Sequence, residues 1–160
     1  GSDINFLLSG VPAATCRGRG ELIEPVALAG KFFFVAVRPK SGNSTASVFR
    51  ATMLSAQCQN SSAVVSALAR QGSQHLHDVV FNRLTSAAQK TNPEMADLMT
   101  RLGKLARRPV CMSGSGSTVF VIADSRNEAA QILSQVKQTF HMTAWILETV
   151  SSVAATCELS

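Results

Sequence analysis

Residues 112–123 read MSGSGSTVFVIA and decide the fold of this 160-residue chain. The stretch begins with glycines and small hydroxyl side chains, and it ends in five apolar residues. A short apolar run that follows glycine and serine is typical of a buried strand after a tight turn. Gly114 and Gly116 allow positive φ angles, and the backbone N–H groups of such loops can face phosphate oxygens. We therefore predict a glycine loop at 112–118 that leads into a central strand and is a candidate phosphate-binding site.

Apolar spacing along the rest of the chain predicts alternating strands and helices. The run KFFFVAVR at 31–38 is an apolar strand that Pro39 ends, and a polar loop then leads to a helix beginning near Ser44. Residues 13–27 suit a turn followed by a short strand. Further elements are predicted as helices at 61–71, 76–90, 92–103 and 125–140, and as a closing strand at 142–150.

The helix that begins at Asn92 has the clearest start signal. Asn92 can cap the first turn, Pro93 suits the first helical position, and Glu94 complements the helix dipole. Apolar residues at helical spacing predict one buried face, made by Met95, Leu98, Met99 and Leu102. Together the elements predict an α+β fold, a ferredoxin-like sandwich with helices on one face of a mostly antiparallel sheet.

The composition is that of an ordinary globular domain, with 46% hydrophobic and 16% charged residues. No apolar run approaches the roughly 20 residues that a membrane span requires, and the opening apolar stretch at 6–8 is too short for a signal peptide. We therefore expect a cytoplasmic protein without a membrane partner.

Cysteine and histidine spacing predicts no metal site. The cysteines lie far apart, so we expect reduced and mostly buried thiols rather than zinc ligands or a redox motif. They are Cys16, Cys58, Cys111 and Cys157. His75, His77 and His141 are expected to lie on the surface.

The net charge of +5 raises nucleic acid as a partner, but we rank this possibility last. The basic residues are dispersed along the sequence, and only 6% of the chain is aromatic, with no Tyr. Few aromatic side chains are therefore available to stack on nucleic-acid bases. Small anionic ligands explain the charge equally well. Arg107 and Arg108 are expected to form a solvated helix end.

Three further segments, read with the glycine loop, carry a family resemblance. They are GSDINFLL at 1–8, GRGE at 18–21, and the stretch 39–49 that ends in STASVF. In this order and at these distances they resemble the C-terminal half of the GHMP small-molecule kinases. The nearest branch phosphorylates the 2-hydroxyl of 4-diphosphocytidyl-2-C-methyl-D-erythritol with ATP, in the non-mevalonate route to isoprenoid precursors.

The resemblance implies roles for particular residues. The opening segment matches a family motif whose aspartate is catalytic, which gives Asp3 the role of accepting or orienting the proton of the attacking hydroxyl. Asn5 stands where the family usually has proline, so the start of this helix is expected to be held differently. The glycine loop matches the motif beside the bound ATP and substrate, which assigns nucleotide contacts to Gly114, Ser115, Gly116, Ser117 and Thr118. Mg²⁺ would accompany ATP.

The family's main nucleotide loop, of the type Pro-x-x-x-Gly-Leu-Gly-Gly-Gly-Ser-Ser, is missing from these residues. The chain also opens without Met, and Gly1 and Ser2 look like residues left by cloning. We therefore expect a fragment that is inactive without an N-terminal half. Its residues 1–30 would end the catalytic domain, and 31–160 would form the C-terminal domain.

Other functions stay open at this point. Another kinase of the family, such as one acting on homoserine, mevalonate or galactose, would share the same fold, although GRGE and the stretch 39–49 favour the diphosphocytidyl branch. A freestanding ligand-binding module of ferredoxin-like fold would use the same sheet without chemistry. Taken alone, Asp3 would be an exposed carboxylate or a helix cap.

Overall fold

The computed structural model describes residues 3–53 and 60–150, and its centre is a four-stranded antiparallel sheet. The strands are β3 (Phe33–Arg38), β4 (Cys111–Met112), β5 (Val119–Ala123) and β6 (Thr143–Glu148), in the spatial order β4-β5-β3-β6. Val35 of β3 pairs with Val121 on one side and with Ile146 on the other. The sheet confirms the predicted α+β fold. The expectations for Gly1, Ser2, Cys58 and Cys157 fall outside the described residues.

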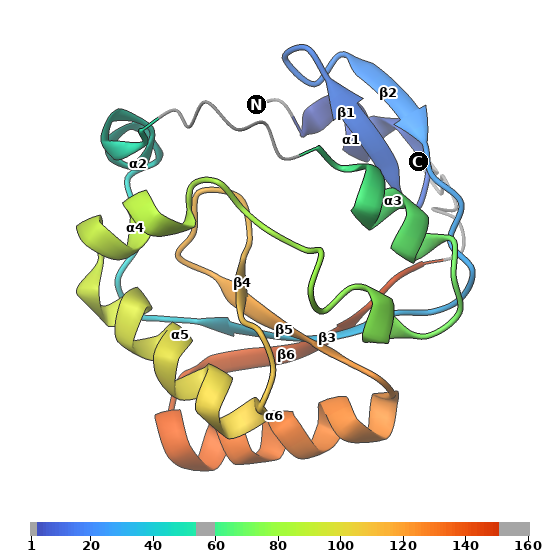
Figure 1. The fold of residues 1–160 in the computed structure, drawn as a ribbon. Coiled ribbons are helices and arrows are strands. Elements are labelled where there is room, and N and C mark those ends of the chain that lie inside the picture. Colours follow the sequence, from blue (N-terminus) through green and yellow to red (C-terminus); the bar gives the residue numbers. More distant parts are fainter. Residues whose placement is uncertain (1–2, 54–59, 151–160) are drawn as a thin grey trace, which may run out of the picture.

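Two long helices, α5 (Pro93–Ala106) and α6 (Arg126–Phe140), cover one face of this sheet (Figure 1). As predicted, the Asn92 side chain caps α5 by accepting a hydrogen bond from the Met95 N–H at 3.0 Å. Residues of α5 and α6 share a core with Val35 and Val37, which are fully inaccessible to solvent. The four apolar α5 residues named from the sequence are all buried there.

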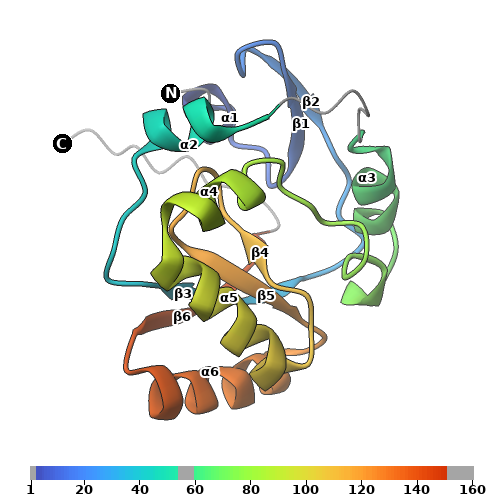
Figure 2. The ribbon, with the colours of Figure 1, turned by 60° about the vertical axis from the view of Figure 1, so that its left-hand side comes forward.

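The opposite face of the sheet carries a smaller core. The short helix α3 (Ser62–Leu68) packs there, on the side away from α6 (Figure 2). Phe32, Leu76 and Ile122 are buried in this second core. The polypeptide therefore covers part of the second face in addition to the predicted helical layer.

The predicted helix over 76–90 is wrong in its first half. A 3₁₀ turn, η1 (Ser73–His75), leads into turns, and helix α4 covers only Thr85–Thr91. Leu76 packs in the second core, whereas Ala87 and Ala88 pack in the first. Because the two apolar groups belong to cores on opposite faces of the sheet, one straight helix could not bury both.

The N-terminal segment forms a separate small layer. Helix α1 (Ile4–Ser9) precedes an antiparallel hairpin of β1 (Ala14–Arg17) and β2 (Leu22–Pro25), of which only β2 was predicted. Helix α2 (Thr45–Ala51) begins after Ser44, as predicted. Figures 1 and 2 place α1, the hairpin and α2 on the side of the sheet away from α6.

Arg108 belongs to an ionic cluster and does not lie at a solvated helix end, which corrects the sequence prediction. Its guanidinium contacts Asp124 at 2.5 Å and Glu128 at 2.6 Å, and its side chain is 17% exposed. His77 lies against it and is largely buried, so the surface prediction for this histidine is also wrong. Although burial acts to raise the pKa of Asp124, hydrogen bonds from Ser73 and Arg108 outweigh it and lower this pKa.

The remaining predictions of which side chains are exposed or buried are partly confirmed and partly wrong. Arg107, His75 and His141 are exposed and Cys111 is buried, as expected, whereas Cys16 is exposed. Burial raises the pKa of the Cys111 thiol. None of the helices within residues 3–53 and 60–150 combines the length and apolar character needed to cross a membrane.

Candidate functional site

The glycine loop at 112–118 connects β4 to β5, as the sequence predicted. Two internal hydrogen bonds close it: the Ser113 N–H donates to the Thr118 carbonyl at 3.0 Å, and the Gly116 N–H donates to the Ser113 carbonyl at 2.9 Å. Gly114 and Gly116 have φ angles of +55° and +84°. Because other residues rarely adopt these angles, the two glycines are needed for this turn.

The two glycines face different surroundings. A Cβ added to Gly114 would meet nothing within 4 Å, so this residue borders open space. A Cβ on Gly116 would lie 2.5 Å from the Nδ2 of Asn43 and 2.9 Å from the Sδ of Met112. Gly114 therefore lies on the accessible side of the loop, and Gly116 on its packed side.

Two asparagine side chains from other segments bind the carbonyl groups of the loop. Asn82 donates to the carbonyls of Met112 at 2.8 Å and Gly114 at 2.7 Å. Asn43 donates to the carbonyl of Ser115 at 2.9 Å. The sequence predictions missed both residues. For Asn82, the available signal in the sequence was its position directly after the apolar residues 79–81.

Two hydroxyl groups of the loop, those of Ser115 and Ser117, make hydrogen bonds within the protein. Ser117 is buried and donates to the carbonyl of Ser41 at 2.7 Å. The Ser115 hydroxyl shares a 2.9 Å hydrogen bond with that of Thr45, the first residue of α2. Thr118 lines a cavity of about 250 Å³ with apolar neighbours such as Phe120. The Ser117 side chain therefore anchors the loop to the segment that contains Ser41.

A second layer of hydrogen bonds fixes the loop at 39–44 against the start of α5. Asn92 donates to the Oδ1 of Asn43 at 2.8 Å and accepts from the Ser41 hydroxyl at 3.1 Å. The carboxylate of Glu94 accepts from the N–H groups of Lys40 and Ser41 at 3.1 and 2.9 Å. Hydrogen bonding by the Ser41 side chain and then by these amides lowers the pKa of Glu94. The capping residues of α5 thus also position the neighbours of the glycine loop.

Asp3 lies at the start of α1, and its carboxylate is exposed and caps no N–H group. Within the described part of the chain, no hydrogen bond or ion pair joins it to the glycine loop. Asn5 donates to the Gly20 carbonyl at 3.3 Å, which ties α1 to the hairpin turn. A proline at this position could not make this contact, because its side chain has no N–H group.

The GRGE segment forms the turn between β1 and β2. Gly18 and Gly20 have φ angles of +67° and +96°, and the Glu21 carboxylate accepts from the Arg19 N–H at 2.5 Å. Arg19 is exposed, and no ligand contact is assigned to it.

An exposed aromatic residue lies on α2, the helix whose first residue contacts the glycine loop. Phe49 is 60% exposed and follows Thr45 by four residues, which places both on the same face of α2. Thr45 itself contacts Ser115 of the glycine loop. This side of the site therefore offers a free aromatic ring.

The described residues form no cluster that would hold a metal ion. Among them, no three His, Cys, Asp or Glu side chains gather closely enough to hold a metal ion.

Known proteins resemble this chain in both sequence and structure. Residues 61–141 match the family described as GHMP kinases C terminal. The chain is 31% identical over 138 residues to 4-diphosphocytidyl-2-C-methyl-D-erythritol kinase of Shouchella clausii strain KSM-K16, covering 86% of this chain and 46% of that protein. The kinase of the same name from Pelotomaculum thermopropionicum is 31% identical over 141 residues, with 87% and 49% covered. The chain therefore spans about half the length of the curated relatives it matches.

Solved structures agree with the sequence matches. A crystal structure of 4-(cytidine 5'-diphospho)-2C-methyl-D-erythritol kinase superposes with a TM-score of 0.73 at 29% identity, covering 92% of this chain and 53% of the other. Homoserine kinase from Cytophaga hutchinsonii superposes with a TM-score of 0.60 at 15% identity, covering 82% of this chain and 45% of the other, which indicates a shared fold alone. With its sheet, its glycine loop and these matches, the chain belongs to the GHMP kinase family, through that family's C-terminal domain.

Proposed function

We propose that this chain is the C-terminal part of an ATP-dependent kinase that phosphorylates the 2-hydroxyl of 4-diphosphocytidyl-2-C-methyl-D-erythritol, in non-mevalonate isoprenoid synthesis. The observation that carries the proposal is the agreement among relatives: several proteins named for this activity are about 30% identical over most of the chain. The homoserine kinase shares only 15% identity, which favours the diphosphocytidyl substrate over an amino acid.

The proposed reaction is a direct phosphoryl transfer. The substrate oxygen forms a bond to the γ-phosphorus, the bond from that phosphorus to the β–γ bridging oxygen breaks, and ADP leaves. The hydroxyl proton passes to the carboxylate of Asp3, which is exposed and free to meet a substrate. Backbone N–H groups of the glycine loop, at Gly114 and Ser115, would stabilise the negative charge of the phosphates.

ATP and Mg²⁺ are the proposed cofactors, and Mg²⁺ when bound with ATP would neutralise phosphate charge. The described residues gather no cluster of three metal-binding side chains, and we propose that the ion binds together with the nucleotide. The exposed ring of Phe49 is a candidate to stack on the cytosine base of the substrate, since aromatic side chains stack on any base.

We propose that the active enzyme needs a segment preceding this chain, because the family's main nucleotide loop is not in these residues. Residues 1–30 would complete the catalytic domain, and 31–160 would form the C-terminal domain. The proposal places the enzyme in the cytoplasm, with a small-molecule substrate and without nucleic acid or a membrane as a partner.

The test measures ADP release by the full-length protein with ATP, Mg²⁺ and 4-diphosphocytidyl-2-C-methyl-D-erythritol, with homoserine as the competing substrate. We expect release with the diphosphocytidyl substrate, and we expect Asp3→Asn to lower kcat by roughly 100-fold or more, in the range of general acid–base contributions. Asp97→Asn, an exposed change on α5, is the matched control. A folded full-length protein that releases ADP only with homoserine would overturn the substrate assignment, and full activity of Asp3→Asn would overturn the role of Asp3.

A further inference from the structure

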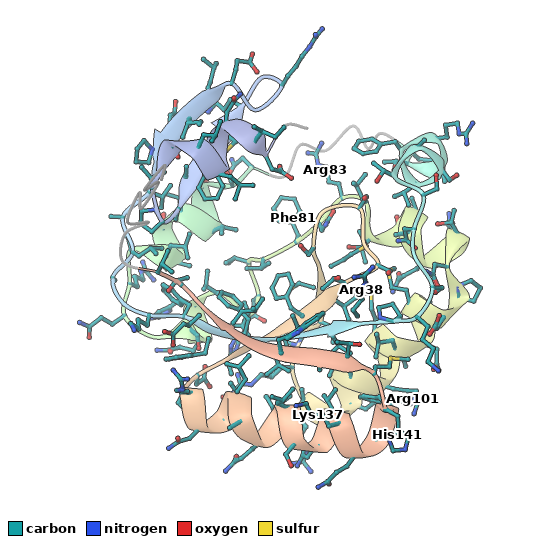
Figure 3. All side chains as sticks on the ribbon, turned by 180° about the vertical axis from the view of Figure 1, so that it is seen from behind. Arg38, Phe81, Arg83, Arg101, Lys137 and His141 are labelled. Carbon is teal, nitrogen blue, oxygen red and sulfur yellow. The ribbon has the colours of Figure 1, made fainter. Side chains whose placement is uncertain are left out.

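Both polar atoms of the Asn82 side-chain amide make hydrogen bonds within the protein. Its Oδ1 accepts a hydrogen bond from the Leu84 N–H at 2.9 Å, and its Nδ2 donates to the carbonyls of Met112 and Gly114. The orientation of the amide is fixed, because both neighbours of the nitrogen are carbonyl oxygens, which only accept. Figure 3 shows Phe81 and Arg83, the residues on either side of Asn82, beside the β4–β5 loop.

The direction of a carbonyl fixes the direction of the next N–H. In a planar trans peptide the C=O and N–H bonds point in opposite directions, and the bonds from 112 to 116 are all trans. Because the Gly114 carbonyl points at Asn82, the Ser115 N–H points away from it. The Ser113 carbonyl accepts from the Gly116 N–H, so the Gly114 N–H likewise points away from the closed turn.

These two N–H groups are available donors. Within residues 3–53 and 60–150 neither the Gly114 nor the Ser115 N–H donates to a protein group. Gly114 is exposed and borders open space, so a ligand can approach this side of the loop. Successive free N–H groups in a glycine turn form a concave site for an anion.

We propose that Asn82 is a positioning residue, which holds the Gly114 carbonyl so that the N–H groups of Gly114 and Ser115 face a phosphate group of the ligand. The identity of that phosphate rests on the proposed kinase function, whereas the orientation of the loop does not. Asn43 supports the other side of the loop through the Ser115 carbonyl. Asn82 does not touch the substrate and acts through the backbone of the loop.

The substitution Asn82→Asp isolates this role. A carboxylate still accepts the Leu84 N–H, so the local turn keeps its hydrogen bond. It has no N–H to offer the two loop carbonyls and sets a negative charge against their oxygens. Asn60→Asp is the matched control, because Asn60 also accepts the N–H two residues later, from Ser62 at 3.0 Å. Among the hydrogen bonds of the described residues, none joins Asn60 to the loop.

The experiment uses the full-length protein and two readouts: steady-state kinetics, and hydrogen exchange of peptides covering the glycine loop and strand β5. For Asn82→Asp we expect kcat to fall roughly 10- to 100-fold with a smaller change in KM, the size of effect that misplacement of a reacting group produces. We also expect faster exchange in the loop, with wild-type protection in β5. Asn60→Asp should match the wild type in both readouts.

Wild-type kcat and wild-type loop exchange in Asn82→Asp would overturn the proposal. A loss of protection throughout β5 would also overturn it, since Asn82 would then stabilise the fold generally. If Asn82→Asp does not fold, Asn82→Ser provides the same comparison, because its short side chain cannot bridge both carbonyls. A wild-type protein without kinase activity would remove the proposed function only, and the exchange readout would still decide the role of Asn82.

Discussion

At the scale of single residues, the two glycines of the loop should respond differently to the same substitution. Both adopt positive φ, so Gly114→Ala and Gly116→Ala each incur about 1–2 kcal/mol of backbone strain. Only at Gly116 does the added methyl group also collide with neighbours, Asn43 and Met112, which costs about 1–3 kcal/mol more. Thermal unfolding of the two variants should therefore give a lower Tm for Gly116→Ala.

This pair of variants is its own control, because the chemical change is identical. Equal losses of Tm would mean that the side chains of Asn43 and Met112 move aside freely, and that the hydrogen bond from Asn43 to the Ser115 carbonyl contributes little. Gly42, with open space around it and no positive φ, should tolerate alanine without a large change in Tm.

At the scale of elements, the hydrogen bonds between Glu94 at the start of α5 and the loop at 39–44 depend on pH. The folded state lowers the pKa of Glu94, because the Ser41 side chain and the N–H groups of Ser41 and Lys40 hydrogen-bond to the ionised carboxylate. The resulting stability is present above the ordinary glutamate pKa near 4.5 and is lost as the pH falls through the lower folded-state pKa.

We expect Glu94→Gln to lower the Tm at pH 7, and we expect this difference to shrink as the pH falls below about 4.5, measured by thermal unfolding from pH 3 to 7. Asp97→Asn on the same helix is the control, because the ion pair of Asp97 with Arg101 lies at the exposed surface. A difference between wild type and Glu94→Gln that stays constant over this range would contradict a role for the ionised carboxylate.

Elements with strong local signals could be predicted from the sequence, and those set by packing could not. The α5 start was predicted correctly, because Asn92, Pro93 and Glu94 each favour a helix terminus by a local mechanism. The helix predicted at 76–90 failed because apolar spacing does not tell which core a residue enters, and Leu76 and Ala88 enter different ones. The ionic contacts of Arg108 with Asp124 and Glu128 also join separate elements and leave no pattern in sequence.

At the scale of the whole molecule, the site could be predicted only in part. The glycine loop was found because its residues are contiguous and of an unusual type. Asn43 and Asn82 were missed because they reach the loop from 72 and 32 residues away, a contact that only the tertiary fold creates. The role of Asp3 stays a prediction, since the described contacts do not join it to the loop.

The distribution of exposed apolar residues leads to the last prediction, which concerns the whole molecule. Ile4, Leu7 and Leu8 of α1 are 53%, 70% and 81% exposed and lie at positions that share one helix face. Contiguous exposed apolar residues of this kind mark an interaction surface. Under the proposed function, a surface of the N-terminal half would cover these residues, and that half would also carry the main nucleotide loop. We therefore expect the 160-residue chain alone to release no ADP, and its α1 amides to exchange faster than in the longer protein. Kinase activity of the isolated chain would contradict this expectation, because the chain would then supply the phosphate site by itself. Equal exchange of α1 in both proteins would also contradict it, because no further surface would then cover the apolar residues of α1.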